Sequence, residues 1–253
     1  MLESYLRNRL KEQEILLMTH IVLGYPSFED SYNMVEAMVG AGVDLMELQI
    51  PFSEPIADGP VILRANQESL AAGATVDRCL DFARQAAVDF AIPFVFMTYY
   101  NVLFKRGVEA FVRATARSGL HGAIVPDLPP EEGAEYLDAM AAHGLHPILI
   151  FSPTSSDRRM AYLARYAGGF VYCVARKGVT GAETAFSESL DDYLVRCRRH
   201  TDLPLAVGFG VKQKTDIDFL MGRADIAVIG TETIRVMDRS GLDGVRDFLG
   251  GLR

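Results

Sequence analysis

One pattern recurs along the whole chain: a short apolar segment, a polar loop, an amphipathic helical segment, and a glycine before the next apolar segment. Strands that alternate with helices are typical of parallel sheets, because each crossover between two parallel strands needs a covering element. Eight such units in 253 residues, with no linker or low-complexity segment, predict a single-domain (β/α)8 TIM barrel, an α/β fold, over residues 1–253. The strands are expected at residues 16–22, 45–50, 94–98, 123–126, 146–151, 170–174, 205–207 and 226–229.

Helices are expected between these strands, each with its own start and stop signals. The segment 27–39, for example, begins with Ser27 as an N-cap and carries Glu29 and Asp30 in its first turn. A doubly wound open sheet is the alternative fold, but it usually carries a GxGxxG motif near the first strand, which is missing here. The remaining helices are expected at residues 66–72, 75–90, 108–118, 131–143, 157–166, 190–200, 215–221, 231–238 and 242–249.

Charge and composition exclude several classes of function. The formal net charge is −8 and the basic residues are scattered, which argues against nucleic acid or an anionic membrane surface as a partner. No apolar run approaches the ~20 residues needed to span a bilayer, and residues 1–5 show no secretory h-region. The histidines show no zinc-binding spacing, so no metal site is expected. Three widely spaced cysteines predict reduced, buried thiols and a cytoplasmic location; they are Cys79, Cys173 and Cys197.

The second expected strand carries an ionisable residue where a packed sheet would not need one. Side chains alternate along a strand, so Leu45, Glu47 and Gln49 share one face. The other face is apolar as well, which is typical of a strand that is covered on both sides. Burying the Glu47 carboxyl is unfavourable and tends to raise its pKa, so its position near the end of this strand indicates a functional role. A structural, salt-bridged glutamate is the alternative.

A second carboxylate follows in the next loop. Asp58 lies between Pro55 and the pair Gly59–Pro60, which restrict the backbone on either side. One desolvated carboxyl and one carboxylate in a polar loop can divide acid and base roles between them. We therefore predict that Glu47 and Asp58 are the catalytic residues. An ordinary turn residue is the alternative interpretation of Asp58.

Glycines at the ends of the last two strands indicate an anion site. In (β/α)8 barrels a phosphate often binds in the loops after the seventh and eighth strands. Glycine lets backbone N–H groups approach an anion, and a helix N-terminus adds electrostatic attraction. A single GxG motif is often only a tight turn. The phosphate site is predicted because glycines follow both the seventh and the eighth expected strands. The residues expected to bind phosphate are Gly208, Phe209, Gly210, Gly230 and Thr231.

Other polar and aromatic residues fall at the same end of the predicted barrel. The long loop 176–183 holds Thr180 and Gly181, and it is either a mobile lid or a solvated surface loop. Tyr99 follows the third strand and is expected to line the substrate site. Tyr172, in the sixth strand, is either an aromatic wall of the site or a core residue.

Taken together, these motifs resemble those of one known family, the alpha subunit of tryptophan synthase, and the match runs nearly from end to end. Its most specific pieces are residues 47–60 (ELQIPFSEPIADGP), 176–183 (RKGVTGAE) and 208–210 (GFG). The resemblance implies a (β/α)8 barrel that cleaves indole-3-glycerol phosphate, by a retro-aldol reaction, into indole and glyceraldehyde 3-phosphate.

The resemblance also assigns roles to individual residues. Glu47 matches the acid/base that protonates indole C3 and takes the proton of the glycerol hydroxyl. Asp58 matches the carboxylate that binds the indole N–H, and Tyr172 matches the tyrosine beside the catalytic glutamate. Thr180 matches the lid threonine that positions Asp58. The phosphate-binding positions are matched by Gly181, Gly208, Phe209, Gly210, Gly230 and Thr231, where Thr231 replaces the commoner serine.

Partners and cofactors are implied in the same way. The family's alpha subunit uses no metal or organic cofactor, and it docks on a pyridoxal-phosphate-dependent beta subunit in an alpha2beta2 heterotetramer. Two alternatives stay open: a free-standing indole-3-glycerol phosphate lyase that releases indole, and a weakly catalytic regulatory subunit that senses the phosphate ligand. Three residues depart from the family's pattern: His20 stands where an apolar residue is usual, Gln49 replaces glycine, and Glu54 replaces aspartate.

Overall fold

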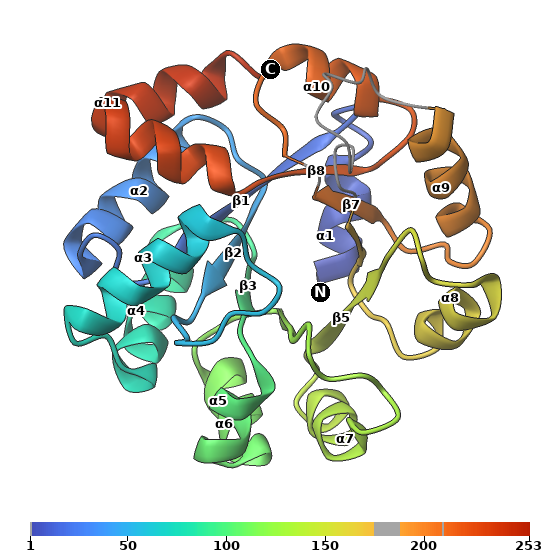
Figure 1. Cartoon of the computed structure of the whole chain (residues 1–253), viewed down its shortest axis with the longest axis horizontal. Coiled ribbons are helices and arrows are strands. Elements are labelled where there is room, and N and C mark those ends of the chain that lie inside the picture. The colour runs from blue at the N-terminus through green and yellow to red at the C-terminus, as the bar shows by residue number, and fades with distance from the viewer. Residues whose placement is uncertain (1, 175–187, 209) are drawn as a thin grey trace.

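The computed structural model describes residues 2–174, 188–208 and 210–253. These residues form a closed barrel of eight parallel strands in sequence order, in which β8 pairs with β1 (Figure 1). The predicted (β/α)8 barrel is thereby confirmed. The strands are β1 (Leu16–Val22), β2 (Leu45–Gln49), β3 (Phe94–Met97), β4 (Gly122–Ile124), β5 (His146–Phe151), β6 (Val171–Val174), β7 (Leu205–Gly208) and β8 (Ile226–Ile229).

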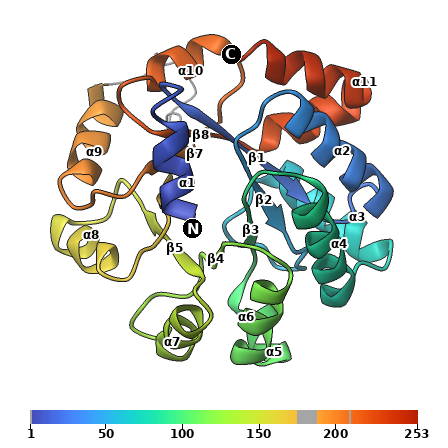
Figure 2. The ribbon, with the colours of Figure 1, turned by 180° about the vertical axis from the view of Figure 1, so that it is seen from behind.

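A ring of helices surrounds the strands, as both views of the ribbon show (Figures 1 and 2). The helices are α1 (Leu2–Arg9), α2 (Phe28–Gly40), α3 (Pro60–Ala71), α4 (Val76–Asp89), α5 (Tyr100–Arg106), α6 (Val108–Arg117), α7 (Ala134–Ala142), α8 (Asp157–Ala164), α9 (Glu188–Arg198), α10 (Lys214–Leu220) and α11 (Thr231–Gly250). Segment α11 contains the break that the sequence predicts between two helices, because Gly241 has a φ of 65° and leaves the helical conformation.

Alternate residues of each strand belong to two separate apolar clusters. Leu17 and Ile21 of β1 belong to the large outer cluster between the strands and the helices. Leu16 and Met18 belong to the cluster inside the barrel, as does Leu45 of β2. Every residue of β1 and β2 is buried, which confirms the expectation that the second strand is covered on both sides.

Helix α1, which the sequence did not predict, closes the barrel at the N-terminal ends of its strands (Figure 2). Its side chains Leu2 and Leu6 are fully buried, and they pack in the interior cluster with residues that begin strands, such as Leu16 and Leu45. This helix is short and only weakly amphipathic in sequence, so it is the docking of two leucines into the barrel that stabilises it.

A few other elements begin or end away from their predicted bounds. Helix α3 starts at Pro60 rather than at residue 66, since proline suits the first helical position. Helix α5 was not predicted, and α7 starts at Ala134 instead of residue 131. Strands β1, β5 and β8 have the predicted bounds.

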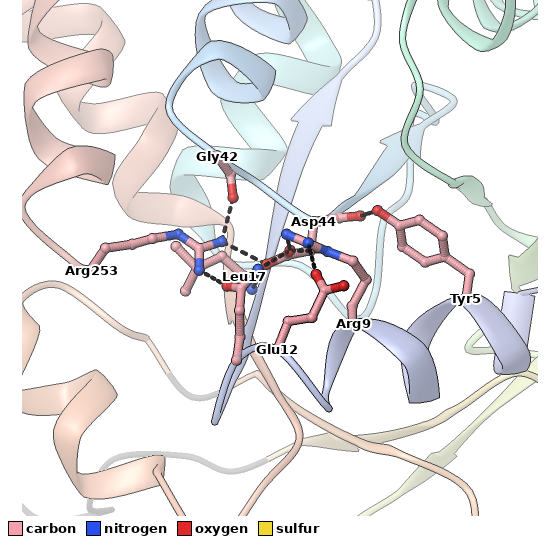
Figure 3. A network of polar contacts seen from close by, with 8 residues as sticks. Tyr5, Arg9, Glu12, Leu17, Gly42, Asp44 and Arg253 are labelled. Carbon is pink, nitrogen blue, oxygen red and sulfur yellow. Dashed lines mark hydrogen bonds and ion pairs between the residues drawn. The ribbon is translucent and has the colours of Figure 1, made fainter.

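A buried carboxylate joins the first strands to both ends of the chain (Figure 3). The side chain of Asp44 is fully buried, and it accepts hydrogen bonds from Arg9 Nη2 at 2.9 Å and Arg253 Nη2 at 2.7 Å. It also accepts from the backbone N–H of Leu17 at 2.9 Å and from Gln13 Nε2 at 3.1 Å. We call these five residues the Asp44 clasp. Two guanidinium groups and two neutral donors offset the desolvation of this carboxylate.

The Asp44→Ala substitution should lower the free energy of unfolding by about 3 kcal/mol, because it removes the buried carboxylate that joins Arg9, Arg253 and the N–H of Leu17. Urea denaturation followed by circular dichroism measures this loss. The matched control is Asp243→Ala, which removes an exposed carboxylate that pairs with Arg246 at 2.8 Å and should change stability by less than about 1 kcal/mol. Equal losses in the two variants would contradict a structural role for the clasp.

Candidate active site

The side chains of β1 and β2 that face the barrel interior are apolar at the start of each strand and polar toward its C-terminal end. His20 follows Leu16 and Met18 on β1, and Glu47 follows Leu45 on β2. The strand register places His20 directly opposite Glu47. His20 Nδ1 lies 2.5 Å from Glu47 Oε1, and the two residues are only 3% and 5% exposed. Glu47 thus lies inside the barrel, as the sequence predicts.

Electrostatics favour the charged form of His20. Burial lowers the pKa of the imidazole, but the Glu47 carboxylate raises it through its charge and its hydrogen bond, and the net shift is upward. The second polar atom of each group, His20 Nε2 and Glu47 Oε2, is buried and makes no hydrogen bond with any residue that the structure describes. Buried polar atoms without a partner are unfavourable, so these two atoms are candidates for contact with a bound substrate.

Asp58 is held by two side chains from neighbouring strands and loops. Gln49 Nε2 donates to Asp58 Oδ2 at 2.6 Å, and the Tyr99 hydroxyl donates to the same oxygen at 3.1 Å. The Ala57 N–H donates to the Tyr99 hydroxyl at 3.1 Å, which fixes the loop against the tyrosine. Asp58 is half-buried, and desolvation raises its pKa, although the Gln49 hydrogen bond opposes this shift. Its surroundings are therefore less polar than the sequence led us to expect.

Asn66 of α3 supports this arrangement, and the sequence did not identify it. It is fully buried, and its Oδ1 accepts from the backbone N–H of Phe52 at 2.9 Å and lies 3.5 Å from Gln49 Nε2. Its Nδ2 donates to the carbonyl of Ile62 at 2.8 Å. The sequence alone could not identify this asparagine, because its burial depends on α3 beginning at Pro60 and packing with Asn66 toward the barrel.

Tyr172 of β6 packs against the interior cluster. Burial raises its pKa well above the ordinary value, and the nearby charges of Glu47 and Asp58 add to that shift. The phenol therefore stays protonated in the same region as the two carboxylates. A Cβ atom at Gly208 of β7 would lie 2.6 Å from the Tyr172 hydroxyl oxygen, so the structure requires glycine there to accommodate the tyrosine.

The remaining predicted residues fall at the same end of the barrel or outside the described residues. Gly230 follows β8 directly, and Thr231 is the first residue of α11. A Cβ atom at Gly230 would lie 3.6 Å from His20 Cβ, so this glycine lies beside His20. Gly210 is exposed and has a φ of +87°, a conformation that favours glycine. Three predicted site residues lie outside the described residues: Thr180, Gly181 and Phe209.

The described part of the chain contains no group of three or more His, Cys, Asp or Glu side chains arranged to hold a metal ion. The cysteines are free and buried, as predicted. Within the same residues, no helix combines the length and the apolar character that crossing a membrane requires.

Comparisons with known proteins agree on one family. The family model described as "Tryptophan synthase alpha chain" matches residues 6–246. The tryptophan synthase alpha chain of Desulforapulum autotrophicum is 64% identical over 252 residues and covers 100% of both chains. That of Methanosarcina mazei is 39% identical over 229 residues, which cover 90% of this chain and 83% of the relative.

Solved structures give the same result. A structure of Mycobacterium tuberculosis tryptophan synthase matches with a TM-score of 0.91 at 31% identity, over 99% of this chain and 96% of that one. Tryptophan synthase subunit alpha from Legionella pneumophila matches with a TM-score of 0.90 at 28% identity, over 99% and 96% of the two chains. In fold and in sequence over its whole length, the chain belongs to the tryptophan synthase alpha chain family.

Proposed function

We propose that this chain cleaves indole-3-glycerol phosphate into indole and glyceraldehyde 3-phosphate, a step of tryptophan biosynthesis in the cytoplasm. The observation that carries the proposal is the pair of carboxyl groups at the C-terminal end of the barrel: Glu47, buried among interior side chains, and Asp58, held by Gln49 and Tyr99. In this fold, the chemistry occurs at that end of the barrel.

Glu47 supplies the acid and base steps. A protonated Glu47 carboxyl delivers its proton to indole C3, and the resulting carboxylate then removes the proton of the glycerol hydroxyl next to the bond that breaks. The C–C bond electrons return to the indole ring while the hydroxyl carbon becomes the aldehyde. The proton of the hydroxyl thereby restores the acid form of Glu47, so no net proton is consumed.

Asp58 stabilises the nitrogen side of the same reaction. Protonation of C3 places positive charge on the ring nitrogen, and a carboxylate that accepts the indole N–H offsets that charge. The hydrogen bonds from Gln49 and Tyr99 both end on Oδ2, so Oδ1 of Asp58 is the oxygen we assign to the indole N–H. Thr180 is assigned to the lid that completes this contact.

The substrate phosphate is assigned to the glycine-rich ends of β7 and β8. Thr231 begins the first part of α11, which continues to the break at Gly241, so the N-terminal dipole of this helix attracts an anion, and its backbone N–H groups can bind one. Gly208, Gly210 and Gly230 expose the backbone around this helix end, and Gly181 and Phe209 are assigned to the same subsite. Tyr172 and Tyr99 are assigned to the walls around the indole ring.

Two exposed apolar residues support docking of a pyridoxal-phosphate-dependent beta subunit in an alpha2beta2 complex. Ile56 is 80% exposed in the loop after β2, and Phe104 is 68% exposed in α5, after β3. Both segments follow the C-terminal ends of strands, which is the end where indole would be released. Large apolar side chains exposed near a site favour a protein partner.

Glu47→Gln should lower kcat for cleavage at least about 100-fold, because it removes the group that both donates and accepts the proton. Binding of a non-cleavable phosphate analogue of the substrate should stay within a few-fold of the original protein. Steady-state indole release and calorimetric titration measure these two quantities. Glu68→Gln, on the exposed face of α3, is the control and should retain full activity. Loss of analogue binding in Glu47→Gln would show that Glu47 has a different role.

Gly210→Ala should raise KM about tenfold or more, because it blocks one backbone hydrogen bond to a charged group, with a smaller effect on kcat. Gly222→Ala is a matched control: both glycines are exposed and have positive φ, +87° and +75°, but Gly222 precedes β8 at the opposite end of the barrel. The control should lose a similar amount of stability and keep its KM. An unchanged KM in Gly210→Ala would exclude Gly210 from the phosphate site.

Addition of a beta subunit should raise the rate of indole formation, and Ile56→Asp should weaken that activation because it places a charge in an apolar interface. Val88→Asp is the control, since Val88 of α4 is equally exposed, at 79%, but does not follow a strand end. The assay measures indole formation at increasing beta-subunit concentration. Full activity without any response to a beta subunit would favour the free-standing lyase, and activity no higher than that of Glu47→Gln would favour the regulatory subunit.

A further inference from the structure

We propose that His20 is a positioning residue for the reaction: its imidazolium orients the Glu47 carboxyl and stabilises the carboxylate that forms each time Glu47 gives its proton to the substrate. The inference rests on the proposed function, since it concerns how Glu47 performs the assigned acid and base steps. We refer to the two residues below as the His20–Glu47 pair.

The geometry of the pair is set by the barrel itself. His20 and Glu47 are opposite one another in the β1–β2 register, and β1 is in turn paired with β8 on its other side. His20 Nδ1 donates to Glu47 Oε1 at 2.5 Å, and both residues are almost completely buried. One carboxyl oxygen is thereby occupied, whereas Oε2 has no partner among the described residues, so we assign Oε2 to the substrate.

The groups around His20 favour its charged form. Glu47 on β2 is the nearest, and Asp58 in the following loop adds a second negative charge. The pKa values of Tyr172 on β6 and of Tyr99, just after β3, are both raised further above neutral pH, so these residues remain neutral phenols. The residues of β8, the other neighbouring strand, are all uncharged, and Gly230 lies beside His20 Cβ. Glu232 follows in the first turn of α11.

A positive charge at this position has a chemical use. When Glu47 transfers its proton to indole C3, a buried carboxylate is left behind, and a buried carboxylate without a partner is strongly disfavoured. An imidazolium in hydrogen-bond contact stabilises that carboxylate without taking part in bond breaking. The same hydrogen bond keeps Oε2 in place to receive the proton of the glycerol hydroxyl.

The pH dependence follows from the protonation of His20. The Glu47 carboxylate raises the pKa of His20 above its ordinary value, so the stabilising charge is complete below pH 6.5 and is lost as pH rises through the raised pKa. The kcat of the unmodified chain should therefore fall as the pH rises through the pKa of His20.

The decisive variant is His20→Asn, whose side-chain amide can donate a hydrogen bond from about the place of Nδ1 but cannot carry the charge. It should lower kcat at neutral pH about tenfold, and the alkaline fall of kcat that His20 causes should disappear from the pH profile. His20→Leu, which removes both the hydrogen bond and the charge, should lose more activity. The control is His143→Asn, because His143 lies 2.8 Å from Glu109 in an exposed pair far from the barrel interior.

Nuclear magnetic resonance of the full chain tests the pair without substrate. The imidazole signal of His20 is identified by its absence in His20→Asn, and its titration gives the pKa directly. Glu47→Gln should lower that pKa because it removes the neighbouring charge, whereas Glu68→Gln should leave it unchanged. If His20→Asn fails to fold, single Asn substitutions of the other four histidines assign their signals, and the one signal that remains belongs to His20. Its titration in Glu47→Gln then decides the matter.

The outcomes separate this inference from the function on which it depends. A His20→Asn variant with the original pH profile and rate, or a His20 pKa unaffected by Glu47→Gln, would overturn the role of His20 while cleavage of indole-3-glycerol phosphate stands. Absence of cleavage by the unmodified chain, with the pair still coupled in the titration, would instead overturn the proposed function.

Discussion

The alternation of side chains in a closed barrel governs where this protein can place a charged group. Every second residue of each strand points into an interior that Leu16, Met18 and Leu45 fill with apolar side chains. A carboxyl group placed there loses its water, so it needs a partner on an adjacent strand. The register of β1 against β2 supplies that partner for Glu47, because it brings His20 opposite.

The buried acids at the two ends of the barrel differ in how many of their oxygens are hydrogen-bonded. At the N-terminal end, both oxygens of Asp44 accept hydrogen bonds, from two arginines, a glutamine and a backbone N–H, and the carboxylate is a structural element. At the C-terminal end, one oxygen of Glu47 is hydrogen-bonded to His20, and the other has no partner among the residues that the structure describes. A fully satisfied acid stabilises a fold, whereas a half-satisfied acid remains available for a ligand.

Much of this architecture could be predicted from the sequence, because periodicity and glycine positions are local signals. The bounds of β1, β5 and β8 and the burial of Glu47 follow from such signals. Helix α1 and the Asn66 contacts could not be predicted, since each depends on side chains from distant segments. From the sequence, His20 could be recognised only as a departure from the family's pattern. Its contact with Glu47 follows from the strand register, which the sequence does not give.

The pairing of β1 with β8 has a consequence for how the protein is made. Residues 16–19 of the first strand bond to residues 226–229 of the last, so nearly the whole chain must leave the ribosome before the cylinder can close. At a synthesis rate of about 5–20 residues per second, the first strand waits for its final neighbour on the order of ten seconds or more. Until then, β1, which carries His20, lacks its neighbour on one side, and the barrel interior around Glu47 is not closed. The nascent chain therefore acquires its desolvated acid only when translation is almost complete.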